Sequence, residues 1–223
     1  MSDYQAKTGV VFDLDGTLLN TLEDLAASTN HTLLHFGYQA RTLEEIKGFV
    51  GNGIKKLVQR AMPAGILSDD FQHYYNYFRQ YYYRNIKNKT KPYPGILKML
   101  KQLKAEGVLL AIVSNKFQEG VDELCRSFFN DLIPIAIGNQ KEIMPKPAPD
   151  SLYLAIHKLG LDANKDKIFY VGDSDIDILT SRNANIPIIA VTWGFRSKEE
   201  LIGLNPEYLA KKPEDIVKII KEM

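Results

Sequence analysis

Acidic residues are concentrated in two short segments, and each segment directly follows a run of apolar residues. The first is Asp13-Leu-Asp15-Gly16-Thr17, and the second is Gly172-Asp173-Ser-Asp175-Ile-Asp177. Carboxylates held close together repel one another, so they stay ionised only where a cation neutralises their charge. Mg²⁺ fits best, because it binds through one or two carboxylates and completes its shell with water and phosphate oxygens. The two segments therefore predict a Mg²⁺ site at which a phosphorylated compound can bind.

A bound phosphate would also need neutral hydrogen-bond donors and a fixed positive charge. Ser114-Asn115-Lys116 follows another apolar run, and Lys146 lies among the prolines of Met144-Pro-Lys-Pro-Ala-Pro149. Because prolines restrict the backbone around Lys146, a functional role is favoured over that of a solvated loop lysine. With an aspartate as the nucleophile, this set of residues predicts Mg²⁺-assisted phosphoryl transfer.

Each motif has a simpler interpretation when it stands alone. An Asp-x-Asp pair can be a surface turn, and Ser114 and Asn115 can cap the helix that follows them. Asp177 can be a first-turn carboxylate that the helix dipole favours. The occurrence of all the motifs together favours the catalytic interpretation.

The elements that must position these motifs are five short apolar runs rich in β-branched residues. They cover residues 9–12, 108–113, 133–137, 168–171 and 186–191. Continuous apolarity is typical of strands that are buried on both faces, and segments with helical periodicity separate the runs. We therefore predict a doubly wound parallel α/β sheet. Ligands bind such sheets beyond the carboxyl ends of the strands, where the motifs lie.

The region between Asn20 and Lys91 has no convincing strand pattern and several helix signals. Thr21-x-x-Asp24 begins one predicted helix, and Thr42-x-x-Glu45 has the capping-box form for the next. We therefore predict an α/β core domain made of residues 1–19 and 92–223. We expect an all-helical cap domain of residues 20–91 to be inserted after the first strand.

Half of the twelve tyrosines lie between residues 74 and 83. They could form a stacking platform for single-stranded nucleic acid or a dimer surface. The helical stripe of Phe71, Tyr75, Phe78 and Tyr82 favours packing inside the cap instead. His31 and His35 have a metal-compatible spacing, but no glutamate follows His31, and zinc binding is not expected.

Composition narrows the class of protein. The 223 residues carry a formal charge of +1, which gives no general attraction to nucleic acid or to anionic membranes. A single cysteine, Cys125, fits a reducing compartment. The acidic residues and the lack of a long apolar run before Gly16 make a signal peptide unexpected, and no segment approaches the roughly 18 apolar residues of a spanning helix. We expect a cytoplasmic protein, monomeric or homodimeric, whose partner is a small phosphorylated metabolite.

Taken in order, four motifs resemble those of the haloacid dehalogenase-like superfamily of phosphohydrolases. The motifs are Asp13-x-Asp15-Gly16-Thr17, Ser114-Asn115, Lys146-Pro147 and Gly172-Asp173-x-x-x-Asp177. The resemblance covers essentially the whole chain and implies a Rossmann-like core with a cap inserted after the first motif. It also implies that Asp13 is the nucleophile that becomes the aspartyl-phosphate, and that Asp15 is the general acid and base.

The same resemblance implies roles for the remaining motif residues. Ser114 and Lys146 would hold the phosphoryl oxygens. Mg²⁺ would be bound by the Asp13 carboxylate, the Asp15 backbone carbonyl and Asp173. Asp177 would be an outer-shell residue that orients water or Lys146. Asp175 occupies a variable position and receives no role.

Within the superfamily, the chain resembles the phosphoglycolate phosphatase-like branch. The residues concerned are Phe49-Val-Gly51-Asn52-Gly53, Ser114-Asn115-Lys116 and Lys146-Pro-Ala-Pro. The resemblance implies that the loop of Gly51, Asn52 and Gly53 closes over the site, and substrate binding is further expected from Thr17 and Asn115. Lys55, Lys56 and Lys116 could receive a second anionic group of the substrate. Asn20 and Asn185 depart from the pattern, and the first departure leaves the substrate open.

Other activities use similar residues. A phosphomutase resembling β-phosphoglucomutase, or a pyrophosphatase, would share the aspartyl-phosphate. A receiver-type signalling module also surrounds Mg²⁺ with acidic residues, a Ser or Thr and a Lys, but its acceptor follows the third strand. A non-catalytic binding module is disfavoured by the intact Asp13, Asp15, Lys146 and Asp173.

Overall fold

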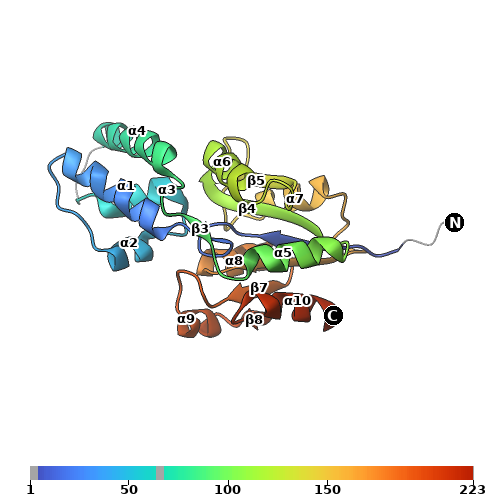
Figure 1. Ribbon diagram of the computed structural model, residues 1–223. Coiled ribbons are helices and arrows are strands. Elements are labelled where there is room, and N and C mark those ends of the chain that lie inside the picture. Colours follow the sequence, from blue (N-terminus) through green and yellow to red (C-terminus); the bar gives the residue numbers. More distant parts are fainter. Residues whose placement is uncertain (1–4, 64–67, 223) are drawn as a thin grey trace.

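The computed structural model describes residues 5–63 and 68–222, and its main body is a parallel sheet flanked by helices (Figure 1). The strand order is β5-β4-β1-β6-β7-β8, and every neighbouring pair is parallel. The strands are β1 (Thr8–Phe12), β4 (Leu109–Phe117), β5 (Ile135–Asn139), β6 (Lys167–Gly172), β7 (Ile188–Val191) and β8 (Tyr208–Ala210). The predicted doubly wound α/β sheet is confirmed.

Two features of the sheet differ from the prediction. The strand predicted to end at Val113 continues to Phe117, so Ser114, Asn115 and Lys116 are strand residues. The cause is that β4 stays paired with β5 beyond an irregularity in register between Val113 and Phe117. In addition, β8 forms a sixth strand at the edge beside β7, and its three residues are too short for an apolar run to reveal it.

Helices cover both faces of the sheet (Figure 1). On one face, Val10 and Phe12 belong to a core cluster with the apolar residues of α5 (Ile96–Ala105), α6 (Gln118–Phe128) and α10 (Pro213–Glu222). On the other face, Val11 belongs to a cluster with α7 (Asp150–Lys158), α8 (Asp175–Ala184) and α9 (Lys198–Gly203). Burial on both faces explains why the strands are continuously apolar.

Four helices follow one another between two short strands and lie beside the sheet, at the left of Figure 1. They are α1 (Leu22–His35), α2 (Leu43–Phe49), α3 (Gly53–Ala61) and α4 (Ser68–Asn85), between β2 (Leu19–Asn20) and β3 (Lys91–Pro92). The predicted capping box of Thr42 and Glu45 is present, and Phe78 and Tyr82 of α4 are fully buried. In the described ranges, none of the helices combines the length and apolarity needed to cross a membrane.

The two connections between this helical segment and the sheet are tied together. β2 and β3 pair as an antiparallel ribbon, and the buried carboxylate of Asp24 accepts hydrogen bonds from the backbone N–H groups of Lys89 and Thr90 and from the Thr90 hydroxyl. α1 begins at Leu22, after Thr21, but Thr21 makes no side-chain capping bond. Asp24 therefore fixes the point at which the helical segment rejoins the sheet.

Candidate active site

A pocket opens where β1, β4 and β6 end at the carboxyl edge of the sheet, next to the helical segment. β1 lies at the point where the strand order reverses, which is the usual position of a ligand in an open α/β sheet. The sheet side contributes Asp13, Asp15, Ser114, Asn115, Lys116, Lys146, Asp173, Ser174, Asp177, Phe195 and Arg196. The helical segment contributes Leu25, Val50, Gly51, Gly53, Ile54 and Leu57.

The ammonium group of Lys146 lies between two carboxylates. Its Nζ is 2.6 Å from Asp13 Oδ1 and 2.7 Å from Asp177 Oδ1, and it also donates to the Tyr170 hydroxyl at 2.9 Å. Burial alone would lower the pKa of Lys146, but the charges of Asp13 and Asp177 outweigh burial and raise it well above its usual value. Lys146 is therefore a permanently charged group held against Asp13.

Both carboxylate oxygens of Asp177 accept hydrogen bonds. Oδ1 accepts from Lys146 and from the Tyr170 hydroxyl, and Oδ2 accepts from the backbone N–H and hydroxyl of Ser174 at the start of α8. Burial tends to raise the pKa of Asp177, but the Lys146 charge and the hydrogen bonds hold it below its usual value. Asp177 thus stays ionised and orients Lys146.

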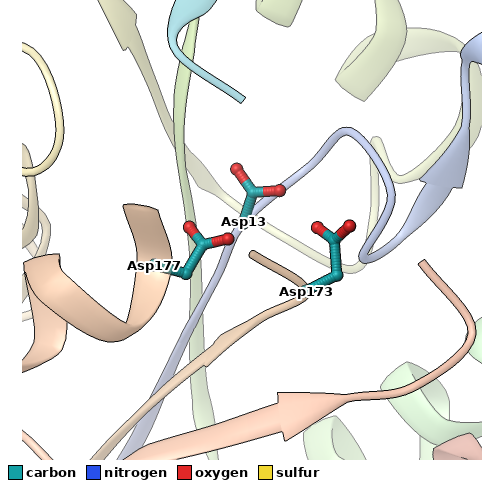
Figure 2. A group of neighbouring side chains, drawn as sticks. All are labelled: Asp13, Asp173 and Asp177. Carbon is teal, nitrogen blue, oxygen red and sulfur yellow. The ribbon is translucent and has the colours of Figure 1, made fainter. Parts of the chain in front are cut away.

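Asp13, Asp173 and Asp177 form a buried acidic cluster (Figure 2). One carboxylate oxygen from each lies within 4.8 Å of the others. Burial raises the pKa of Asp13 well above its usual value, against the effect of Lys146. Burial, and then the charge of Asp177, raise the pKa of Asp173 to about 7. Burial therefore disfavours the ionised forms of Asp13 and Asp173, and a hard divalent cation beside these carboxylates would offset that cost.

The backbone encloses Asp173 closely. A Cβ atom added at Gly16 would lie 2.4 Å from Asp173 Oδ2, and one added at Gly194 would lie 2.3 Å from the same oxygen. The backbone N–H of Phe195 donates to Oδ2 at 2.7 Å, and Thr17 Oγ1 lies 3.0 Å from Oδ1. Asp173 is therefore held in one orientation.

Thr17, which we expected to contact substrate, is fully buried and is not among the residues that line the pocket. Its hydroxyl lies between Asp173 and Asp13, 3.3 Å from Asp13 Oδ2, and its single proton can be donated to either carboxylate. In this structure Thr17 positions the acidic cluster.

Asn115 joins three parts of the site. Its side chain donates to the Lys146 carbonyl at 3.0 Å and the Gly51 carbonyl at 3.3 Å, and accepts from the Lys146 N–H at 2.9 Å. Gly53 has φ +79°, and a Cβ there would approach the Asn115 carbonyl oxygen to 2.9 Å. The loop of the helical segment therefore packs directly on the strand residue, while Ser114 lines the pocket beside it.

The lysines differ in their placement. Lys116 Nζ is buried, lies 2.9 Å from Asp15 Oδ1, and donates to the Tyr82 hydroxyl at 2.6 Å. Lys55 and Lys56 are exposed and do not line the pocket. Asn52 is also outside the lining, and its side chain accepts from Arg60.

Arg196 lines the pocket and was not singled out from the sequence. Its Nε is 3.0 Å from Asp175 Oδ1, and its Nη2 donates to the Val50 carbonyl at 3.0 Å. Its position in the loop after β7 could have predicted this role, because residues that follow the carboxyl ends of the strands face the pocket. Tyr170 and Tyr82 gave no comparable signal, since both lie inside apolar periodic segments.

Known proteins resemble this chain along most of its length. The model of the family described as haloacid dehalogenase-like hydrolase matches residues 10–191. A phosphoglycolate phosphatase from Mannheimia succiniciproducens is 31% identical over 217 residues, covering 94% of this chain and 96% of that protein. One from Aquifex aeolicus is 32% identical, with 95% of each chain covered. A crystal structure from Lactobacillus delbrueckii subsp. bulgaricus, provisionally described as a phosphoglycolate phosphatase, superimposes with a TM-score of 0.89 at 33% identity, covering 97% of this chain and 99% of that one.

Proposed function

The chain belongs to the haloacid dehalogenase-like hydrolase family and is a phosphoric monoester hydrolase, and from this premise we propose that it is a Mg²⁺-dependent phosphatase working through an aspartyl-phosphate. The observation that carries the proposal is the placement of Asp13 in the pocket. Its Oδ1 is 2.6 Å from Lys146, and Asp15 lines the same pocket. A nucleophile, a proton carrier and a fixed cation thus face one space.

In the first half of the reaction, an oxygen of the Asp13 carboxylate attacks phosphorus. The bond between phosphorus and the leaving oxygen breaks, and the Asp15 carboxylic acid gives its proton to that oxygen. Lys146 offsets the negative charge that develops on the phosphoryl group, and Ser114 donates a hydrogen bond to it. The product is the free alcohol and the aspartyl-phosphate.

In the second half, a water oxygen attacks phosphorus and gives a proton to the Asp15 carboxylate. The bond between phosphorus and the Asp13 oxygen breaks, which restores the carboxylate and releases phosphate. Bound by Asp13, the Asp15 backbone carbonyl and Asp173, Mg²⁺ would neutralise the carboxylates and attract the phosphoryl oxygens. Asp177 keeps Lys146 in place throughout.

The helical segment supplies the other wall of the pocket, and this supports treating residues 20–91 as a cap over a core of residues 1–19 and 92–223. The loop of Gly51 and Gly53 lies at the pocket. The names of the curated relatives support 2-phosphoglycolate as the substrate. The cytoplasmic location, the monomeric or dimeric state and a substrate contact by Lys55 remain predictions.

The proposal is tested by Mg²⁺-dependent phosphate release from phosphoglycolate, sugar phosphates, nucleotides and pyrophosphate. We expect Asp13→Asn to abolish release and stay folded, while Asp122→Asn, an exposed carboxylate on α6, keeps wild-type activity. Turnover by Asp13→Asn would contradict the nucleophile assignment. Isomerised sugar phosphate in place of free phosphate would identify a phosphomutase.

A further inference from the structure

The ammonium group of Lys116 connects the helical segment to a residue of the reaction. It lies 2.9 Å from Asp15 Oδ1 and donates to the hydroxyl of Tyr82, on α4, at 2.6 Å. Tyr82 is 0% exposed and Lys116 2%. A side chain of the helical segment is thus linked to Asp15 through a single buried lysine.

A buried ammonium is costly unless its charge is paired and its protons have acceptors. Asp15 supplies the opposite charge, and Tyr82 supplies a neutral acceptor at the end of a fully buried ring. If α4 moves away from the sheet, Tyr82 no longer accepts from Lys116. The lysine then loses the contact that fixes its direction, and Asp15 loses a rigid partner.

Of the contacts that the structure gives to the Asp15 carboxylate, the ion pair of Oδ1 with Lys116 is shorter than the contact of the other oxygen. Its other oxygen, Oδ2, is 3.5 Å from Ser114 Oγ, which is a weak contact. Within residues 5–63 and 68–222, Lys116 is therefore the nearest charged partner that the structure gives to the Asp15 carboxylate. Proton transfer requires this carboxylate to be within hydrogen-bond reach of the leaving oxygen, so its orientation decides whether it can act.

We propose that Lys116 is a positioning residue through which Tyr82 makes the orientation of Asp15 depend on the seating of the helical segment. The inference rests on the proposed function, because it concerns the acid and base of that reaction. It differs from the expectation that Lys116 receives a second anionic group of the substrate. In this structure its ammonium group already contacts Asp15 and Tyr82.

The test compares Tyr82→Phe with Tyr83→Phe, the same change at the next residue of α4, where the ring is 45% exposed. Each variant is assayed with p-nitrophenyl phosphate, whose leaving group needs no proton, and with an alkyl phosphate, whose leaving group does. The kcat/KM of each substrate reports the steps up to formation of the aspartyl-phosphate. Thermal unfolding checks that each variant is folded.

We expect Tyr82→Phe to lower kcat/KM about tenfold for the alkyl phosphate and about twofold or less for p-nitrophenyl phosphate. The tenfold loss is a fraction of the rate enhancement of about 10²–10⁴ that general acid–base catalysis supplies. Tyr83→Phe should change neither. Lys116→Met, the second variant, should show the same preference for the good leaving group with a larger loss.

Equal losses on both substrates, or no loss in Tyr82→Phe, would overturn the inference. The inference would also be overturned if Lys116→Met changed only the KM of substrates that carry a second anionic group. A wild-type protein that releases phosphate from neither substrate would instead contradict the proposed function, on which the inference depends.

Discussion

Protons should compete with Mg²⁺ for Asp173. The pKa of this carboxyl is raised to about 7 by burial and then by the charge of Asp177, while the hydrogen bonds from Phe195 and Thr17 lower it only in part. In the protein without metal, Asp173 therefore takes up a proton as the pH falls through 7. A cation that binds at pH 6 must displace this proton.

The size of the effect follows from the pKa. With a pKa of about 7, Asp173 is about 90% protonated at pH 6 and about 10% protonated at pH 8. The apparent affinity for Mg²⁺ should then fall about tenfold between pH 8 and pH 6, or about 1.4 kcal/mol. Binding should release about 0.9 proton at pH 6 and about 0.1 at pH 8 from Asp173, and any proton held by Asp13 adds to this number.

Calorimetric titration with Mg²⁺ in buffers of different ionisation enthalpy measures both quantities. Asp173→Asn should lose the binding and the proton release, whereas Asp175→Asn, a carboxylate outside the acidic cluster, should keep both. An affinity that is equal at pH 6 and pH 8, without proton release at pH 6, would refute the reasoning.

The raised pKa of Asp173 also makes the free energy of unfolding depend on pH. The folded pKa of Asp173 lies above its ordinary value of 3.8, so between about pH 4 and pH 7 the folded protein binds more protons than the unfolded chain. Stability without metal should therefore decrease as the pH rises through this window. The increase in Tm caused by Mg²⁺ should grow over the same range.

Two further substitutions test the connection to the helical segment and the enclosure of the metal-binding carboxylate. Asp24→Ala removes the acceptor of two backbone N–H groups and of the Thr90 hydroxyl. Lys89 is exposed, so water can replace the carboxylate at its N–H, but the two buried groups of Thr90 lose their acceptor. At about 1–3 kcal/mol for each buried group, the variant should lose about 2–6 kcal/mol in urea unfolding, and a loss below about 0.5 kcal/mol would show that water replaces the carboxylate at Thr90 as well. Gly194→Ala places a Cβ against Asp173 and should weaken Mg²⁺ binding. The control, Gly203→Ala, should leave Mg²⁺ binding unchanged, because a Cβ there meets nothing within 4 Å. Equal Mg²⁺ binding by both variants would show that the loop at Gly194 shifts and leaves Asp173 in place.

Local sequence patterns predicted much of the fold. The apolar runs predicted the five longest strands of the main sheet, because burial on both faces demands continuous apolarity. Thr42 and Glu45 predicted a capping box that forms as expected. Asn185, a departure from the family pattern, ends α8 with φ 53°, the left-handed conformation that asparagine tolerates.

The side chains gathered at the pocket could also be predicted in part. Asp13, Asp15 and Asp173 directly follow or flank strand ends, and parallel strands bring those ends to one edge. Lys146 was suggested by its prolines, but its position between two carboxylates depends on Asp177 and on the fold of the loop that carries it. The raised pKa values follow from burial, which local sequence does not report.

The sequence alone determined the order and chemical type of the motifs, the α/β sheet and the place of the helical insert. These properties depend on neighbouring residues, whose periodicity and spacing are visible along the chain. Tertiary structure alone decided which charges meet. Lys116 faces Asp15 and Tyr82, and Arg196 reaches the Val50 carbonyl. The physical reason is that these contacts depend on how neighbouring strands pair and how the helical segment is oriented on the sheet, and both are set by packing between residues far apart in the chain.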